Sequence, residues 1–170
     1  GKGHDYNSDV PVAVQFWDVS NRYGTDYTDN STNWCGDIAN SSIYSGNWYH
    51  ITVTYDASDN RLNFYRNGQP DGSDYGCDAG SNTIGWGIGA DGLGHRELDG
   101  RIDEVRISNT IRSAAWIETS YNNQNSPSSF YSVEKNCPTA APPISEFTCS
   151  IPITILGSKV SGTSDLINFP

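Results

Sequence analysis

The chain has 170 residues, of which 35% are apolar, and its formal net charge at pH 7 is −10. This length suits one domain, and the abundance of Gly, Asn, Ser, Thr and Tyr favours short strands joined by polar turns over a helical bundle. With only 10 Lys and Arg residues, the composition excludes a basic surface for nucleic acid, and insertion into a membrane is not expected either.

The N-terminal part predicts strands separated by polar stretches. Apolar and polar residues alternate over residues 12–19, which predicts a first strand. Residues 21–42 follow as a polar stretch with two N-glycosylation sequons, at Asn30 and Asn40. A core does not need the aromatic residues in and directly after this stretch, so they form a candidate ligand surface for glycans: Tyr23, Tyr27, Trp34 and Tyr44.

Two further strands are predicted in the middle of the chain. Residues 46–55 alternate most clearly, with Ile51, Val53 and Tyr55 on one face. Residues 61–66 form the next predicted strand, and the dipeptide that follows indicates a tight hairpin: Asn67-Gly68. Two tryptophans fall in predicted strands and are expected to pack in the core: Trp48 and Trp86.

A strand and a short helix are predicted near the end of this region. Residues 100–107 alternate in a way that places Asp103 on the apolar face of a core strand. A buried carboxylate needs a partner, and Arg112 is expected to supply it, in a structural and not a catalytic role. Ser113 is expected to cap the helix that follows.

These motifs resemble those of a known family. The stretch GRIDEVRI at residues 100–107, with RSAAWI at 112–117 and the Tyr-Asn-Asn tail at 121–123, is similar to the closing motif of laminin-G-like domains in bacterial and archaeal surface proteins. A second motif of the family matches over residues 48–68. The resemblance implies an all-β, concanavalin-type jelly-roll β-sandwich with one short helix, here N-terminally incomplete, and it implies no activity by itself.

The C-terminal part departs from that family. We expect a jelly-roll domain over residues 1–133, a Pro-rich linker over 134–148 and an extended C-terminal tail strand within 149–170. The tail resembles the opening of an adjacent surface domain of unknown function. It is a candidate donor strand that adds to a neighbouring copy and builds a head-to-tail filament, with an apolar face formed by Ile151, Ile153 and Ile155.

Four cysteines in a polar chain indicate an oxidising compartment. They allow three pairings, and we favour Cys35–Cys77 with Cys137–Cys149, which places one bridge in the sandwich and one in the tail. A zinc site is not expected, because no Cys-x-x-Cys pair occurs and the histidines are spread out. No cofactor is expected, although the Asp-rich turns leave calcium open.

Catalysis is not expected. Glu97 and Asp99 are similar to the carboxylate pair of sandwich-fold glycosidases, but the position that would carry a further carboxylate is Arg101. The function predicted is a structural or adhesive subunit of an extracellular, cell-surface assembly, whose partners are further copies or neighbouring surface domains. The alternative is a carbohydrate-binding module of a larger secreted or surface protein. The apolar tail strand distinguishes these two functions, since assembly requires it and sugar binding does not.

Overall fold

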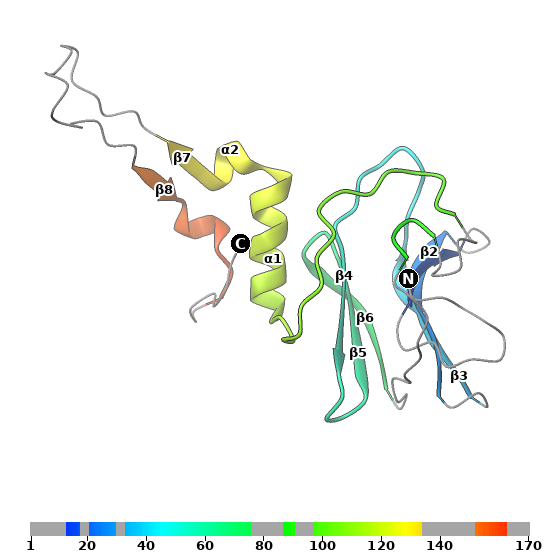
Figure 1. Ribbon diagram of the computed structural model, residues 1–170. Coiled ribbons are helices and arrows are strands. Elements are labelled where there is room, and N and C mark those ends of the chain that lie inside the picture. Colours follow the sequence, from blue (N-terminus) through cyan, green and yellow to red (C-terminus); the bar gives the residue numbers. More distant parts are fainter. Residues whose placement is uncertain are drawn as a thin grey trace, which may run out of the picture. The chain divides into compact units, whose positions relative to one another are not determined.

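The computed structural model describes residues 13–17, 21–29, 33–75, 87–90, 97–133 and 152–162. The chain divides into two compact units, Gly1–Arg112 and Ser113–Pro170, which we describe separately (Figure 1). In these described parts of the chain, no helix has both the length and the apolar character needed to cross a membrane.

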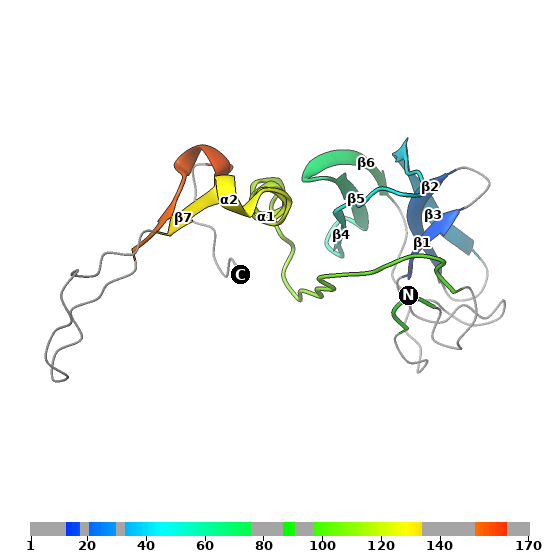
Figure 2. The ribbon, with the colours of Figure 1, turned by 90° about the horizontal axis from the view of Figure 1, so that it is seen from above.

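The described residues of the first unit form two antiparallel sheets of three strands each (Figures 1 and 2). Within each sheet the strands follow chain order, so consecutive strands of the same sheet are hydrogen-bonded to each other. The first sheet consists of β1 (Ala13–Trp17), β2 (Arg22–Asp29) and β3 (Asn33–Ser42), and the second of β4 (Ile51–Asp56), β5 (Arg61–Arg66) and β6 (Gln69–Tyr75). The sequence predicted an N-terminally incomplete jelly-roll sandwich, and the described residues show small sheets and not a full sandwich.

The core of this unit lies between the two sheets. In the register of β4 and β5, Val53 is opposite Phe64 and Tyr55 is opposite Leu62, so the apolar residues share one face. The rings of Tyr23 and Phe64 meet edge to face, with their centroids 6.3 Å apart. The predicted face of the strand is confirmed, because the buried cluster of Tyr23, Ala39, Leu62 and Phe64 packs against Ile43, Ile51, Val53 and Tyr55.

The predicted hairpin between β5 and β6 is also confirmed. Arg66 is paired with Gln69, which leaves a two-residue turn. Its residues have φ values of 52° for Asn67 and 78° for Gly68. Two successive positive φ values are what a type I′ turn requires, and Asn-Gly is the dipeptide that adopts them most easily.

The second unit is built on one helix. Ser113 caps α1 (Ala114–Asn125), since its hydroxyl accepts a 3.2 Å hydrogen bond from the amide of Trp116, as predicted. The other elements described in this unit are α2 (Pro127–Phe130), β7 (Tyr131–Val133), β8 (Ile153–Ile155) and the 3-10 turn η1 (Gly157–Lys159).

The C-terminal tail lies along elements of this same unit (Figure 1). β8 pairs with β7 in antiparallel fashion. Beyond β8, the side-chain amide of Asn122 donates a 3.0 Å hydrogen bond to the Lys159 carbonyl, and the Ser161 amide donates one of 2.9 Å to the hydroxyl of Thr119. The predicted tail strand therefore pairs within its own chain. The predicted domain limits at residues 133 and 148 stay a prediction.

The core strand predicted over residues 100–107 is not formed. These residues have no regular structure and are exposed, and Glu104 has a φ of 52°, outside the extended region. The predicted burial of Asp103 is therefore wrong, and its carboxylate accepts a 2.9 Å hydrogen bond from the Glu104 amide instead of pairing with Arg112. Alternation alone does not make a strand, because the backbone also needs a neighbouring strand, and the described residues provide none here.

Candidate functional site

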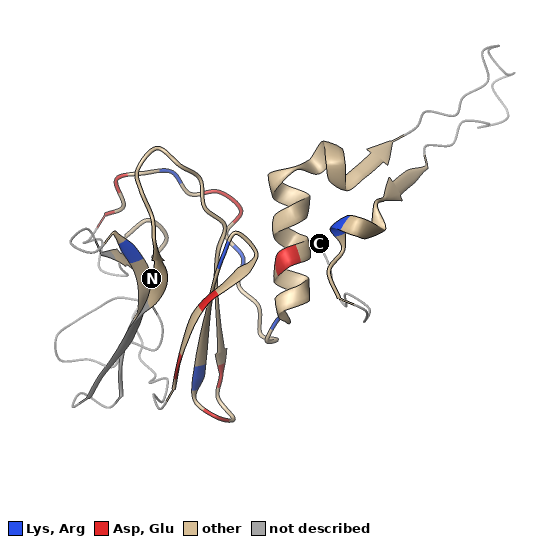
Figure 3. Cartoon of the chain, turned by 180° about the vertical axis from the view of Figure 1, so that it is seen from behind, with Lys and Arg blue, Asp and Glu red and all other residues tan. Residues whose placement is uncertain are grey.

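Charged residues give little indication of a site. Lys, Arg, Asp and Glu are dispersed over the described parts of both units (Figure 3). No group of three or more His, Cys, Asp or Glu residues that would hold a metal ion occurs in the part of the chain that the structure describes. Several members of the Asp-rich turns have side chains outside that part, so calcium, which the sequence left open, is not tested at these residues: Asp26, Asp29, Asp78 and Asp91.

Exposed aromatic side chains gather on the segment that joins the two sheets. We call residues 43–50, between β3 and β4, the aromatic loop. Tyr44 is 61% exposed and Trp48 is 64% exposed. The prediction that Trp48 packs in the core is wrong, because β4 begins only at Ile51 and the alternation of that strand does not extend back to Trp48.

Hydrogen bonds within the aromatic loop hold its shape. The Tyr44 amide donates a 3.2 Å hydrogen bond to the hydroxyl of Tyr49. The side-chain amide of Asn47 lies 3.4 Å from the Tyr44 carbonyl and 3.3 Å from the Ser45 carbonyl, and it donates to both. Gly46 has a φ of 82°, a conformation that glycine adopts without strain. The loop therefore presents its two exposed rings from a preformed backbone.

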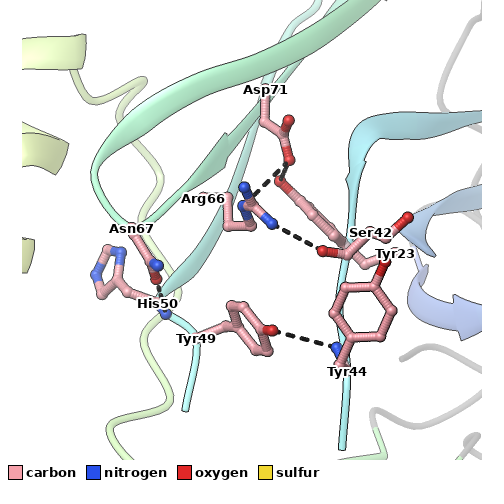
Figure 4. Close-up of polar contacts among 8 residues, drawn as sticks. All are labelled: Tyr23, Ser42, Tyr44, Tyr49, His50, Arg66, Asn67 and Asp71. Carbon is pink, nitrogen blue, oxygen red and sulfur yellow. Dashed lines mark hydrogen bonds and ion pairs between the residues drawn. The ribbon is translucent and has the colours of Figure 1, made fainter. Parts of the chain in front are cut away.

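The loop is also joined to the β5–β6 hairpin. The amide of His50 donates a 3.0 Å hydrogen bond to the Asn67 side chain, and the Asn67 amide donates one of 2.8 Å to the His50 carbonyl (Figure 4). Burial lowers the pKa of His50, and the positive charge of Arg106 adds to this effect. The imidazole is consequently neutral at pH 7.

Arg66 lies between the aromatic loop and the first sheet (Figure 4). Its guanidinium donates a 2.7 Å hydrogen bond to the Ser42 carbonyl at the end of β3. The guanidinium carbon lies 5.9 Å from the centroid of the Tyr49 ring, within the range of a cation–π contact. Arg66 therefore connects β5 to both ends of the segment that carries the exposed rings.

Arg66 also lies beside a buried hydrogen-bonded pair, Tyr23 and Asp71. Its Nε atom lies 4.0 Å from the Asp71 carboxylate, which also accepts a 2.7 Å hydrogen bond from the Tyr23 hydroxyl (Figure 4). Tyr23 is 0% exposed and Asp71 is 6% exposed. Burial raises the pKa of Tyr23 far above its usual value, and the hydrogen bond to Asp71 raises it further. The phenol is thus a permanent donor that holds Asp71 beside Arg66.

The structure describes some of the site residues that the sequence predicted and leaves others untested. Tyr44 lies on the aromatic loop, whereas Tyr23 is buried and cannot be part of a ligand surface. Asn40 is exposed on β3. Eight further predicted site residues lie outside the described residues, or only their backbone is described, so they stay predictions: Tyr27, Asn30, Trp34, Cys35, Cys77, Cys137, Cys149 and Ile151.

Sequence reasoning assigned Trp48 to the core and so missed it as a surface residue. One signal was available, namely Gly46 and Asn47 immediately before it, a pair typical of turns.

A family model agrees with this fold. The model described as "Concanavalin A-like lectin/glucanases superfamily", of the laminin-G type, matches residues 5–118. The chain belongs to this family. The match includes both sheets, the aromatic loop and the first residues of α1.

A search of curated proteins finds no match. Among solved structures, the chain is similar to residues 221–444 of an S-layer domain-containing protein from Clostridium thermocellum ATCC 27405, with 20% sequence identity and a TM-score of 0.40. The similarity covers 69% of this chain and 65% of that one, so it spans slightly less than two thirds of the other chain.

Proposed function

We propose that this chain is a non-catalytic, carbohydrate-binding module of a larger secreted or cell-surface protein, and that the aromatic loop binds the sugar. The observation that carries the proposal is the exposure of Tyr44 and Trp48 on one loop that its own hydrogen bonds preform. Membership of a lectin and glucanase superfamily supports it. The four cysteines support an oxidising, extracellular location.

The chemistry of the loop suits a sugar. Exposed aromatic faces offer apolar area to the C–H faces of a pyranose, while nearby polar groups fix its orientation. Asn47 and Ser45 lie between the two rings in sequence and are exposed, so they provide donors and acceptors for hydroxyl groups. Because the backbone is already ordered, binding costs little loop entropy.

The test is a glycan array followed by titration of the best ligand. Replacing Trp48 or Tyr44 by Ala is expected to weaken binding by about tenfold or more, as for a central aromatic contact. Tyr75→Ala is the matched control, because Tyr75 is 57% exposed and is paired with Arg61, at the end of β5 away from Arg66. Equal losses for Trp48→Ala and Tyr75→Ala, or no glycan bound at all, would contradict the proposal.

A second candidate function is a structural or adhesive subunit of an extracellular assembly, in which the tail strand adds to a neighbouring copy. It is favoured by the exposure of Ile153 (66%) and Ile155 (53%) on β8. Donation in trans requires the pairing of β8 with β7 to open. Electron microscopy of the natively isolated protein, with deletion of residues 149–170 as the control, tests it. Filaments that disappear on deletion would support assembly, and single particles in both samples would exclude it.

A further inference from the structure

The residues of the aromatic loop carry no formal charge. Residues 43–50 read IYSGNWYH, which contains no Asp, Glu, Lys or Arg. Its histidine is the residue of the loop that titrates nearest to neutral pH. Burial lowers the pKa of His50, so its imidazole is uncharged at pH 7. The loop therefore offers a ligand aromatic faces, amide groups and hydroxyl groups, and no ionised side chain of its own.

Two described arginines act on the aromatic loop, and each is paired with a carboxylate. The Nε atom of Arg66 lies 4.0 Å from the carboxylate of Asp71 (Figure 4). Arg106, whose positive charge acts on His50, donates a 3.0 Å hydrogen bond to the carboxylate of Glu104. Opposite charges a few Å apart largely cancel each other's field at longer range. These two arginines therefore add little net charge to the loop.

This environment disfavours an anionic sugar. The formal net charge of the chain is −10, which repels anions over long range at low salt. A carboxylate or sulfate group that packs against Tyr44 and Trp48 loses water, and the loop provides no cation that compensates for this loss. A neutral pyranose loses only the hydration of its hydroxyl groups, for which Ser45 and Asn47 offer hydrogen bonds.

We propose that the aromatic loop selects uncharged hexopyranose glycans over uronate or sulfated ones and binds them without a bridging metal ion; this ligand class rests on the proposed function. Selection is a difference between two affinities, and here it comes from the lack of a compensating charge for the anionic competitor. Calcium requires six to eight oxygen ligands, drawn largely from carboxylates and carbonyls. The loop contains no carboxylate with which such an ion would link protein and sugar.

Calorimetric titration of the full chain with paired glycans tests the ligand class. The probes are α- and β-linked hexasaccharides of glucose, mannose and galactose, each with a counterpart oxidised at C6 to the uronate. A neutral glycan is expected to bind, and its uronate counterpart to bind at least about tenfold more weakly at low salt. Uronates that bind as tightly as the neutral glycans would overturn the selection and leave a sugar site at the loop. No binding of any probe, or binding that Trp48→Ala leaves unchanged, would overturn the proposed function as well.

The effects of salt and of a chelator provide a second test with the same neutral glycans. Their affinity is expected to change less than about twofold when NaCl is raised from about 20 mM to about 500 mM, because salt screens only interactions between charges. EDTA is expected to leave the affinity unchanged. An affinity that falls steeply with salt would overturn the uncharged character of the contact, and one that EDTA abolishes would overturn its independence of metal.

A charge variant tests the electrostatic basis of the selection. Glu104→Gln removes the carboxylate that Arg106 contacts, so it is expected to raise the affinity for the uronates by about threefold at low salt. Asp59→Asn is the matched control, because it removes the same charge from an exposed residue of the β4–β5 turn, at the other end of β4 from the loop. Equal changes for the two variants, or none for Glu104→Gln, would overturn the role given to the pair of Arg106 and Glu104.

Discussion

The hydroxyl of Tyr23 donates a 2.7 Å hydrogen bond to the carboxylate of Asp71, although the two residues are 48 positions apart. This bond joins β2 of the first sheet to β6 of the second. Both residues are buried, and Asp71 in turn lies beside Arg66, which contacts Ser42 and Tyr49. The polar contacts between the sheets thus also fix the base of the aromatic loop.

Tyr23→Phe is expected to destabilise the first unit by about 2 kcal/mol. The substitution removes a hydrogen bond to a charged acceptor and leaves a buried carboxylate with one fewer donor. The change in free energy of unfolding is measured by urea denaturation. Tyr65→Phe is the control, since Tyr65 is buried but has no side-chain hydrogen bond within the described residues, and it should change stability little. Equal effects of the two substitutions would contradict this account.

Thr25→Val is expected to stabilise the first unit by about 1 kcal/mol. Thr25 is 0% exposed, and its hydroxyl has no hydrogen-bond partner in the described structure. Replacing an unsatisfied buried hydroxyl by a methyl group of similar shape removes the cost of its desolvation. The matched variant Thr54→Val should give no gain, because that hydroxyl accepts a hydrogen bond from Asn63. A lower urea midpoint for Thr25→Val would sink the prediction.

The stability of the first unit is expected to fall as the pH is lowered below about 6.5. The folded protein lowers the pKa of His50 below its value of 6.5 in a model compound. At pH values between the pKa of His50 in the folded protein and its pKa in the unfolded chain, the unfolded chain binds more protons than the folded protein. The free energy of unfolding therefore decreases with decreasing pH and levels off below the folded pKa.

Urea midpoints between pH 7.5 and 5 measure this effect, and His50→Gln should reduce the slope. Asp56 does not interfere, because hydrogen bonds from Ser58 lower the pKa of its carboxyl below 3.8 and its contribution is lost only at more acidic pH. A slope that His50→Gln leaves unchanged would assign the pH dependence to other groups.

Gly162→Ala is expected to loosen the tail by about 1–3 kcal/mol. Gly162 has a φ of 88°, and an added Cβ would lie 2.8 Å from the Cβ of Ala115 on α1. Both the backbone strain and the overlap oppose docking of the tail. Exchange of the Ser161 amide should become faster. The control is Gly157→Ala, whose added Cβ meets no atom within 4 Å and should have little effect; similar effects of the two would contradict the packing argument.

Local features were predictable from the sequence. β5 (Arg61–Arg66) has the predicted bounds, and the Asn67-Gly68 turn and the Ser113 cap are as predicted. Each of these features depends on residues close together in the sequence. The strand follows from alternation of side chains, the turn from tolerance of positive φ, and the cap from a side chain that accepts a hydrogen bond from the amide three residues later. The family also followed from motifs in the sequence, since the matched region includes residues 48–68, 100–107 and 112–117, although not the tail at 121–123.

Which residues form the candidate site could be recognised only from the tertiary structure. Nothing local distinguishes buried Tyr23 from exposed Tyr44, because the burial of Tyr23 is produced by Phe64 and Asp71, which lie far along the chain. Likewise, the alternation around Asp103 does not reveal whether a strand lies beside it. The sequence by itself determined which short segments are able to form strands, turns and a capped helix. Only the tertiary structure decided which faces are covered and which aromatic rings remain exposed, because burial is a property of packed neighbours and not of a residue's own segment.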